Sequence, residues 1–532
     1  MRRKASHIPF KFALPSGSAC ALISAACLLY SSFFIAQQPL VWSEAFKIPR
    51  NEAITGIVGS DKGGFYVVRQ KEDNEYEVLL DRYSYGEMER QFSNTIVMPA
   101  SGDDKHRFSA LSHVKDGFIL FTSLENTYND TYECYATPLG SDGGKVLDPV
   151  LVHSIPTEMH RTGTFFDYRF SPDSSKFLVF FNSSFERKAK EKLYLRIYGI
   201  DFEMYWKKDL ELPYEQDVIQ IRDYLLDNQA DVYMMSGWAP DKNQTNNKYQ
   251  RPQEGRYVLF HYRWKENRLK EFDVSLKDKT IVSIKAVISN NGDISLAGFF
   301  SNDYLFSVAG TFLFTLDPLT DGVKTATMVP FPKDFLSQFL SERAVDKGMD
   351  LNDFYLDHFI ITDSGEVVLA GEQFFISERV QQDPVTGRQE VEYIRNFNDI
   401  IVVKLHPDGK PIWYRRVAKR QTTSDTGNFS SYNAFTDKED LVVFFNDDPE
   451  NTTLLVSNPT ATPKQYSRER NSVTASVRIS SSGIATRKSI SNNKETGTTL
   501  KPTLSSEAVN GPVILGFEDA RSLKYALYKS TK

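Results

Sequence analysis

A short unit recurs eight times along the chain: a tight turn rich in Asp, Asn, Gly and Ser leads directly into an apolar strand. Neighbouring copies are separated by as few as 53 residues (Phe65 to Phe118) and as many as 74 (Val367 to Leu441). Repeats of this size, built from short strands, are typical of β-propellers, in which each blade is a four-stranded antiparallel sheet. The apolar strands of the copies begin at Phe65, Phe118, Phe177, Val232, Ile294, Val367, Leu441 and Val513.

The pattern within one repeat supports four strands per unit. In the sixth copy, apolar and alternating segments cover 354–362, 366–375, 398–406 and 411–417, and Asp- and Gly-containing turns join the first to the second and the third to the fourth. No Pro-rich or Gly/Ser-rich stretch divides the chain. We therefore expect an all-β fold with a single β-propeller domain over 40–532, with eight four-stranded blades and seven as the alternative.

The eighth copy lacks one strand. After strands expected at 498–506, 511–518 and 522–530 the repeat pattern ends, whereas 39–49 precedes the first repeat and resembles a fourth strand, with Trp42 placed like Trp413. We predict that residues 40–49 pair with 522–530, which would close the ring and cover both open sheet edges.

The N-terminus has the pattern of an export signal. Basic residues cluster before Phe12, no charge occurs from Phe12 to Ser43, and the most apolar run extends from Ala19 to Ala36. We expect residues 1–36 to be a signal peptide, with an uncleaved N-terminal anchor as the alternative. The chain would then be exported to the periplasm, the outer cell surface or the extracellular space. Beyond this segment only Cys134 remains, so an intramolecular disulfide is not possible.

Charge and motifs exclude several function classes. The net charge of −6 lacks the basic excess of a surface that binds phosphate backbones, so we expect no nucleic acid partner. The chain contains no G-x-S-x-G, H-E-x-x-H, P-loop or Rossmann glycine motif. No two histidines beyond the signal stand at metal-ligand spacing on one element. We therefore predict no catalytic residue, no metal and no cofactor.

Loop lengths provide the strongest functional indication. Second-to-third and blade-to-blade connections share one face of a propeller, and they hold every long insertion: 238–255, 331–351, 376–395, 418–430 and 446–471. Insertions on one face build binding surfaces on a rigid scaffold. We expect a short helix within 333–348. The candidate binding residues on this face are Arg395, Lys419, Arg420, Gln421 and Tyr432.

Two segments resemble known families. Residues 170–181, with S-P-D ahead of an apolar strand, resemble the repeat of TolB-type and WD40-like propellers. Residues 397–435, which contain DIIVVKLHPDGKPIW and a K-R-Q loop, resemble, together with 339–375, a group of uncharacterised secreted propeller-like proteins of the Bacteroidota phylum. The resemblance implies an exported propeller and brings no activity or catalytic residue with it.

Two functional hypotheses follow. The first is a monomeric, non-catalytic scaffold that binds an envelope or extracellular protein or glycan through the long-loop face, with membrane contact only through an uncleaved N-terminal segment. The alternative is an envelope enzyme that acts on glycans with carboxylates in the central channel. Acidic residues are abundant enough to provide a catalytic pair, but the sequence does not indicate which two residues would form it.

Overall fold

The computed structural model divides the chain into a unit of Met1–Pro39 and a compact unit of Leu40–Lys532. It describes residues 40–529, apart from gaps at 51, 72–73, 103, 162–165, 183–185, 187, 239–255, 303–306, 383–388, 459, 469–470, 509–511 and 520–521. The predicted signal peptide lies outside these residues, and so does nearly all of the insertion at 238–255. No helix in the described part is long and apolar enough to cross a membrane.

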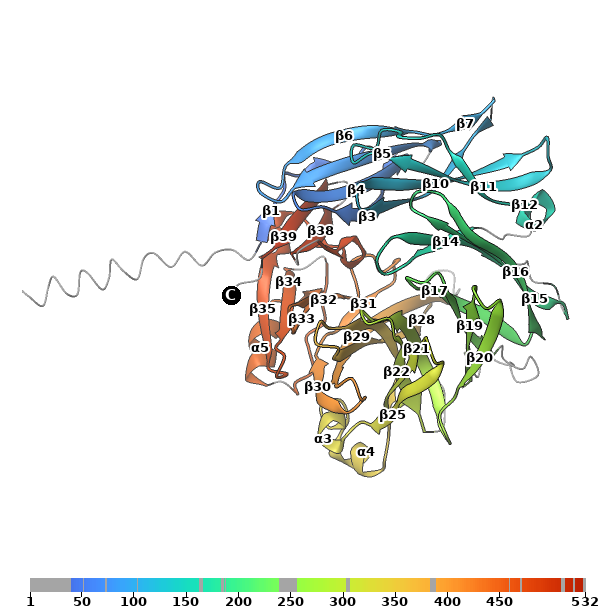
Figure 1. The fold of residues 1–532 in the computed structure, drawn as a ribbon. Helices are drawn as coiled ribbons and strands as arrows, with labels where there is room; N and C mark the ends of the chain where they lie inside the picture. Colours follow the sequence, from blue (N-terminus) through green and yellow to red (C-terminus); the bar gives the residue numbers. More distant parts are fainter. Residues whose placement is uncertain are drawn as a thin grey trace, which may run out of the picture. The chain divides into compact units, whose positions relative to one another are not determined.

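Eight antiparallel sheets, called blades 1 to 8 in chain order, make up the second unit within the residues described (Figure 1). Blade 1 consists of β3 (Glu52–Ser60), β4 (Gly64–Lys71), β5 (Asn74–Ser84) and β6 (Arg90–Val97). Blade 2 consists of β9 (Arg107–Val114), β10 (Gly117–Asn126), β11 (Thr131–Leu139) and β12 (Val150–Pro156). Blade 3 consists of β13 (Asp167–Phe170), β14 (Lys176–Asn182), β15 (Lys190–Gly199) and β16 (Met204–Glu215). Blade 4 consists of β17 (Ile219–Leu226), β18 (Val232–Trp238), β19 (Tyr257–Arg263) and β20 (Arg268–Val274). Blade 5 consists of β21 (Thr280–Ile288), β22 (Ile294–Ser301), β24 (Gly310–Asp317) and β25 (Gly322–Pro330). Blade 6 consists of β27 (Phe354–Ile361), β28 (Val367–Gln382), β29 (Gln389–Leu405) and β30 (Pro411–Val417). Blade 7 consists of β32 (Asn433–Asp437), β33 (Asp440–Asp447), β34 (Val473–Ile479) and β35 (Ala485–Asn492).

Blade 8 combines both ends of this unit. It contains β36 (Thr499–Leu500), β37 (Ser506–Glu507), β38 (Val513–Asp519) and β39 (Ser522–Tyr528), and its outer strand is the N-terminal β1 (Leu40–Trp42) with β2 (Phe46–Lys47). Leu40 pairs with Tyr528 and Phe46 with Leu523, both antiparallel. These are the two segments that the sequence analysis expects to pair.

Each blade packs on the next through a shared hydrophobic core, and the series returns to its start. Phe65 and Val67 of blade 1, for example, are buried with Ile514 and Leu523 of blade 8. Eight further clusters of buried residues join the seven remaining pairs of neighbours, two of them between blades 2 and 3. The 38 Phe and 26 Tyr of the chain supply much of this face-to-face packing. The prediction of an all-β propeller is confirmed.

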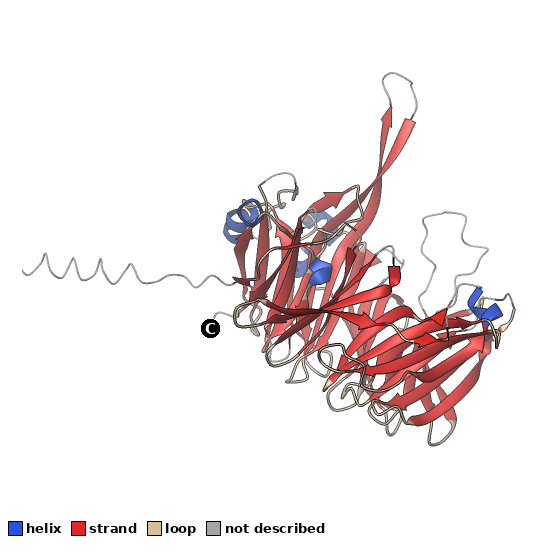
Figure 2. Ribbon diagram, turned by 90° about the horizontal axis from the view of Figure 1, so that it is seen from above, coloured by secondary structure: helices blue, strands red, loops and turns tan. Residues whose placement is uncertain are grey.

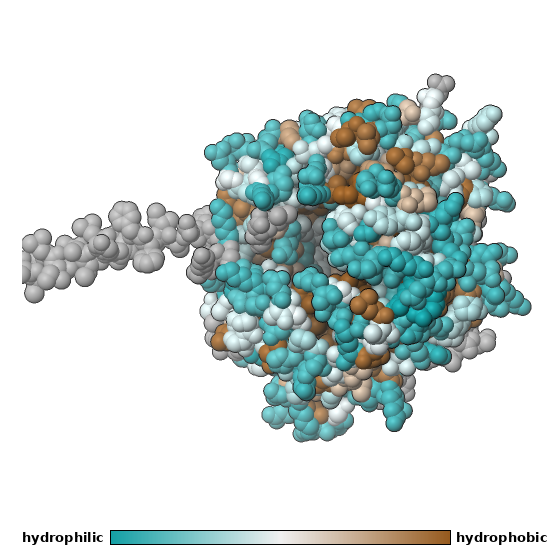
Figure 3. Space-filling view, in the orientation of Figure 1, coloured by the Kyte–Doolittle hydropathy of each residue, from teal (hydrophilic) through white to brown (hydrophobic). Residues whose placement is uncertain are grey.

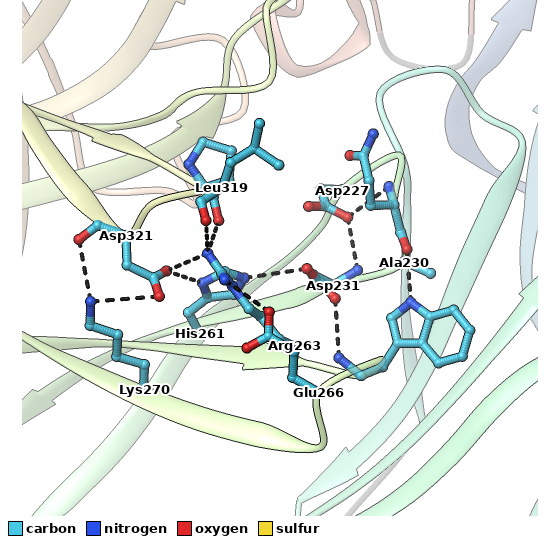
Figure 4. A network of polar contacts seen from close by, with 12 residues as sticks. Asp227, Ala230, Asp231, His261, Arg263, Glu266, Lys270, Leu319 and Asp321 are labelled. Atoms are coloured by element: carbon cyan, nitrogen blue, oxygen red, sulfur yellow. Dashed lines mark hydrogen bonds and ion pairs between the residues drawn. The ribbon is translucent and has the colours of Figure 1, made fainter.

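Short acidic turns also connect the blades, and blades 4 and 5 show how (Figure 4). Buried His261 on β19 lies between two turn residues, with Nδ1 2.8 Å from an Asp321 carboxylate oxygen and Nε2 3.6 Å from one of Asp231. Arg263 and Arg268 also pair with Asp321, at 3.1 and 3.0 Å. The cluster holds adjacent turns together on the short-loop face, so we assign it a structural role.

The long insertions adopt several local structures. Segment 333–348 forms two short helices, α3 (Lys333–Leu336) and α4 (Glu342–Asp346), where the sequence analysis expects one. Phe335 is 2% exposed and packs on Phe331 and Tyr414, so α3 covers the end of a blade. Other short elements are α2 (Thr157–Arg161), α5 (Asn451–Ser457), α6 (Asn493–Thr496), the 3-10 helix η2 (Pro502–Leu504), β31 (Gln421–Thr423), and the pairs β7 (Ala100–Ser101) with β8 (Asp104–Lys105) and β23 (Ser307–Val308) with β26 (Leu351–Asn352).

The insertion at 376–395 is largely regular strand, not an irregular loop. β28 and β29 continue beyond their blade as a two-stranded ribbon, in register from Phe374 opposite Phe397 to Gln382 opposite Gln389. Figure 2 shows this ribbon projecting away from the sheets.

Candidate functional site

Three of the predicted insertions converge on one cavity over blades 6, 7 and 8. The cavity has a volume of about 1150 Å³. This is slightly above the range of roughly 300–1,000 Å³ that is usual for small-molecule sites. Its walls are formed by Arg379, Glu392, Ile394, Thr422, Thr423, Ser424, Asp425, Phe429, Ser430, Gln465, Tyr466, Ser467, Arg468, Asn471, Ser472, Asn493, Lys494, Gly497, Thr498, Thr499 and Asp519.

A buried cation fixes the loop that follows β30. Lys419 is almost completely buried, and its Nζ forms an ion pair with Glu372 of β28. The same nitrogen donates to the Phe397 carbonyl at 3.0 Å and to Gln421 Oε1 at 2.9 Å. Burial lowers the pKa of Lys419, while the Glu372 carboxylate opposes that shift. These contacts fix the position of the loop relative to blade 6.

Buried amides extend this network to the cavity wall. Gln421 Nε2 donates to the Asn446 carbonyl at 2.7 Å, and Asn446 Nδ2 donates to the carbonyls of Phe429 at 2.9 Å and Leu500 at 2.7 Å. Asn493, at the start of α6, donates to Asn446 Oδ1 at 3.3 Å. Because paired buried polar groups resist displacement, the cavity walls are held before any ligand arrives.

Two hydroxyl groups in the wall lack a hydrogen-bond partner within the described residues: Tyr466 OH and Thr498 Oγ1. Tyr466 is 5% exposed and Thr498 is 2% exposed. A buried hydroxyl without a partner costs free energy, on the order of 1–3 kcal/mol. Both residues line the cavity, but their hydroxyl oxygens are themselves buried, so a polar ligand can supply the missing partners only where the wall shifts to expose them.

The charges of the wall are balanced. Three cations (Arg379, Arg468 and Lys494) accompany three carboxylates (Glu392, Asp425 and Asp519). Arg379 lies 3.5 Å from Glu392, and Arg468 lies 3.1 Å from Asp519. The third carboxylate, Asp425, accepts hydrogen bonds from its own loop. The bond from the Gly427 backbone N–H is the main cause of the lowered pKa of Asp425. The cavity is therefore suited to an uncharged polar ligand.

An aromatic ring lies in the same wall. The Arg468 guanidinium carbon stands 3.7 Å from the centre of the Phe429 ring. Phe429 is half-buried and Arg468 is exposed. Because the Arg468–Asp519 ion pair is solvent-exposed and so contributes little free energy, a ligand can displace the guanidinium and pack on the ring.

A second feature lies on the innermost strand of blade 6. The pairing of β27 with β28 shifts between Leu356 and His358, which leaves Asp357 as the extra residue of a β-bulge. The Asp357 side chain is exposed, although protein encloses it on most sides. This enclosure, and next the Glu372 carboxylate, raise the pKa of Asp357 to about 7.

Figure 3 shows a polar face with small separate apolar groups and a hollow near its middle.

The five residues expected to bind a partner have different positions. Lys419, Gln421 and Tyr432 are buried, and the first two hold the loop through the contacts described above; contact of these three residues with a partner stays a prediction. Arg395 is half-buried and donates to the Asp425 carbonyl at 2.7 Å, and Arg420 is exposed. Neither arginine lines the cavity, so their contact with a ligand stays a prediction.

None of the five candidates lines the cavity; its walls come from the predicted insertions at 376–395, 418–430 and 446–471 and from the connection 493–499, together with Ser472 and Asp519. The sequence analysis does not select 493–499, whereas the location of the long insertions was predictable. Their convergence was not, since Phe429, Tyr466 and Thr498 belong to connections of different blades. In the described part of the chain, no group of three or more His, Cys, Asp or Glu side chains is arranged to hold a metal ion.

Comparison with solved structures returns propellers. The chain is similar to a Dos1 propeller (10% identity, TM-score 0.40), covering 92% of this chain and 96% of that one. It is also similar to the WD40 domain of SCAP from fission yeast (8%, 0.39, covering 94% and 97%) and to the β-propeller domain of the Trilobed protease from Pyrococcus furiosus (11%, 0.35, covering 84% and 97%). No protein-family model matches the chain, and no curated protein matches it. The fold assignment rests on the strand pairing and packing of this chain.

Proposed function

We propose that this propeller is an exported scaffold that binds an uncharged oligosaccharide in the cavity over blades 6, 7 and 8. The observation that carries the proposal is the cavity wall itself. It combines hydroxyl and amide groups, two buried hydroxyls without partners, an aromatic ring and balanced charges. Sugars offer hydroxyls that both donate and accept hydrogen bonds, and C–H faces that pack on aromatic rings.

Export to the envelope or the extracellular space is part of the same proposal. The basic leader and the uncharged run from Phe12 to Ser43 support it. The resemblance to secreted propellers of the Bacteroidota phylum agrees with this location, and we propose that affiliation for the chain. A protein partner on the same face is the less favoured form, because the cavity is concave and polar, whereas the cores of protein interfaces are apolar and poor in charge.

The test removes single hydroxyl groups without changing volume. We expect Tyr466→Phe and Thr498→Val to weaken binding of an oligosaccharide, selected on a glycan array, by about 5- to 10-fold each, as a lost hydrogen bond of about 1–1.5 kcal/mol implies. Binding is measured by isothermal titration calorimetry. Tyr233→Phe and Thr311→Val are matched controls, because these hydroxyls are also buried and have no hydrogen-bond partner among the residues that the structure describes, but lie in blades 4 and 5.

Equal affinity of the cavity variants and their controls would contradict the proposal, and so would an array with no oligosaccharide bound. Melting curves of all four variants show whether the fold is intact.

A catalytic role in the channel is a second candidate, and Asp357 is the observation that favours it. A carboxyl with a pKa of about 7 on an accessible strand can donate a proton near neutral pH. Its neighbour Glu372 is 4% exposed and paired with Lys419, so this bulge does not present a second reachable carboxylate. Release of reducing ends from a bound polysaccharide, abolished by Asp357→Asn, would favour the enzyme over the scaffold.

A further inference from the structure

A serine and a histidine lie in contact in the connection from blade 1 to blade 2. Ser101, at the end of β7, is exposed, whereas His106, directly after β8, is 1% exposed. Ser101 Oγ lies 3.0 Å from His106 Nε2, and His106 Nδ1 lies 3.0 Å from Oγ1 of Thr122 on β10. A nucleophile beside a base that a third group orients is the arrangement by which serine enzymes attack acyl groups.

The imidazole of His106 is held in one orientation. Its ring packs on Tyr135 of β11, with ring centres 4.5 Å apart. Thr122 is fully buried, and its hydroxyl oxygen can accept the Nδ1 proton of the imidazole. Nε2 is then unprotonated and accepts the hydrogen bond from Ser101. This is the form of the imidazole that can act as a general base toward Ser101.

The surroundings of His106 suit that task. Burial lowers the pKa of His106 from its usual value of 6.5, while the Glu133 carboxylate opposes that shift. The imidazole is therefore neutral at pH 7 and can take up a proton. Glu133 is 5% exposed and is held by hydrogen bonds from Tyr135 at 2.6 Å and from Thr131 at 2.9 Å. Its negative charge stabilises the imidazolium that forms when the proton arrives.

Tyr135 is the other group that the Ser101 hydroxyl contacts. Burial and the hydrogen bond to Glu133 raise the pKa of Tyr135 to about 12, and a hydrogen bond with Ser101 opposes that rise. The phenol therefore keeps its proton at neutral pH and donates it to Glu133. Because a neutral phenol oxygen is a much weaker base than a neutral imidazole, the Ser101 proton moves to His106.

We propose that Ser101 is a nucleophile that transfers short acyl groups from esters to water, with His106 as its base and Thr122 as a positioning residue. Ser101 Oγ bonds to the ester carbonyl carbon while its proton moves to Nε2. The ester C–O bond then breaks, and the departing alcohol takes the proton from Nε2. Water attacks the acylated serine, gives one proton to Nε2, and releases the carboxylic acid as Ser101 recovers that proton.

The position of Ser101 indicates the kind of ester. The hairpin of β7 and β8 projects outward (Figure 1), and Ser101 is exposed on it. A short acyl group such as acetyl needs little apolar enclosure, and a large alcohol portion meets no obstacle on an exposed hairpin. The sequence analysis expects no catalytic residue, so Ser101 and His106 are additions to it. This activity is independent of the oligosaccharide cavity, which lies over blades 6, 7 and 8.

Hydrolysis of 4-nitrophenyl acetate by the full chain, followed through the absorbance of 4-nitrophenol, tests the proposal. We expect Ser101→Ala and His106→Gln to lower the rate by about 100-fold or more, which is the usual contribution of a positioned base. A fluorophosphonate probe should label Ser101, as located by mass spectrometry of peptides. Ser482→Ala is the matched control, because Ser482 is also exposed in a turn but its hydroxyl partner is Ser480, at 2.9 Å. No label on Ser101, or a wild-type rate in Ser101→Ala or His106→Gln, would overturn the proposal.

A pair of variants separates the positioning role of Thr122 from a purely structural one. Thr122→Val removes the oxygen and should slow ester hydrolysis about 10-fold, as the loss of one hydrogen bond implies. Thr122→Ser keeps the oxygen and should retain the wild-type rate, and melting curves show whether both variants are folded. Equal rates in the two would contradict the assigned role. Tyr466→Phe should hydrolyse the ester at the wild-type rate, so failure of the oligosaccharide proposal leaves this one intact.

Discussion

Asp321 shows how much of this fold depends on single turn residues. Its side chain is 3% exposed and lies within 3.5 Å of nitrogen atoms of Arg263, Arg268, Lys270 and His261. The sequence identifies this residue as part of a turn, because Asp is common where a turn needs backbone hydrogen bonds. It does not reveal the contact with His261, which lies 60 residues earlier on another blade.

We expect Asp321→Asn to lower the free energy of unfolding by about 3 kcal/mol, because removal of one member of a buried ionic cluster leaves the others without compensation. Urea denaturation provides the measurement. Asp148→Asn is the control, since Asp148 is 90% exposed in its pair with Lys145 and its replacement should leave stability nearly unchanged. Equal effects of the two substitutions would show that the cluster contributes nothing specific.

Asp357 gives the protein a defined pH response. A carboxyl whose pKa is raised to about 7 in the fold binds a proton more tightly there than in the unfolded chain, where its pKa is near 3.8. Its contribution to stability is therefore fully present below pH 4 and is lost as the pH rises to about 7. We expect Asp357→Asn to gain stability relative to wild type at pH 8 but not at pH 4, measured by urea midpoints. The pKa values of Glu191 and Asp227 are also raised, to about 7 and about 6. Because both residues are present in the wild type and in the variant, the difference in stability between the two proteins reports on Asp357 alone.

At the level of elements, the loop after β30 depends on one buried ion pair. The K-R-Q run at 419–421 has the composition of an exposed basic loop, and sequence alone cannot reveal that its first residue turns inward. The reason is Glu372, which lies on the second strand of the same blade and provides a buried anion for Lys419. The location of the binding face was predictable from loop lengths, whereas the residues that line it depend on tertiary contacts of this kind.

We expect Lys419→Met to reduce the free energy of unfolding by about 3–5 kcal/mol, since it leaves the Glu372 carboxylate buried and unpaired. The double variant Lys419→Met/Glu372→Gln should recover part of that loss, and a double-mutant cycle from urea denaturation gives the coupling energy. Lys145→Met, at an exposed pair, serves as the control with an expected change within about 0.5 kcal/mol. If the double variant is as unstable as the two losses combined, the pairing is not the cause.

For the whole molecule, the repeat identified the architecture because hairpin turns and apolar strands are local signals. The eight second strands contain the eight predicted starting residues, from Phe65 to Val513. The two helices at 333–346 and the length of the β28–β29 ribbon were less predictable, because their ends depend on packing against blades that the sequence does not place.

The contact between the first and last strands leads to a further prediction. A chain that begins at residue 51 lacks β1 and β2 and exposes β39 as an open edge, so we expect its melting temperature to be far below that of a chain that begins at Leu40. Differential scanning calorimetry provides the comparison. Ser43→Ala, which removes only the hydroxyl that accepts from the Tyr525 N–H at 2.9 Å, should lower it by a few degrees at most. Equal melting temperatures for the two chain lengths would contradict the role of this contact.

The same contact sets the order of events during synthesis. Ser43 leaves the ribosome 482 residues before its partner Tyr525, so blade 8 cannot form until β39 has been synthesised. Until then the emerging chain has one unpaired strand at its beginning and one open sheet at its growing end, and contacts of such separation form slowly. A product truncated before β39 would keep both edges exposed, so closure of blade 8 requires synthesis through the last residues of that strand.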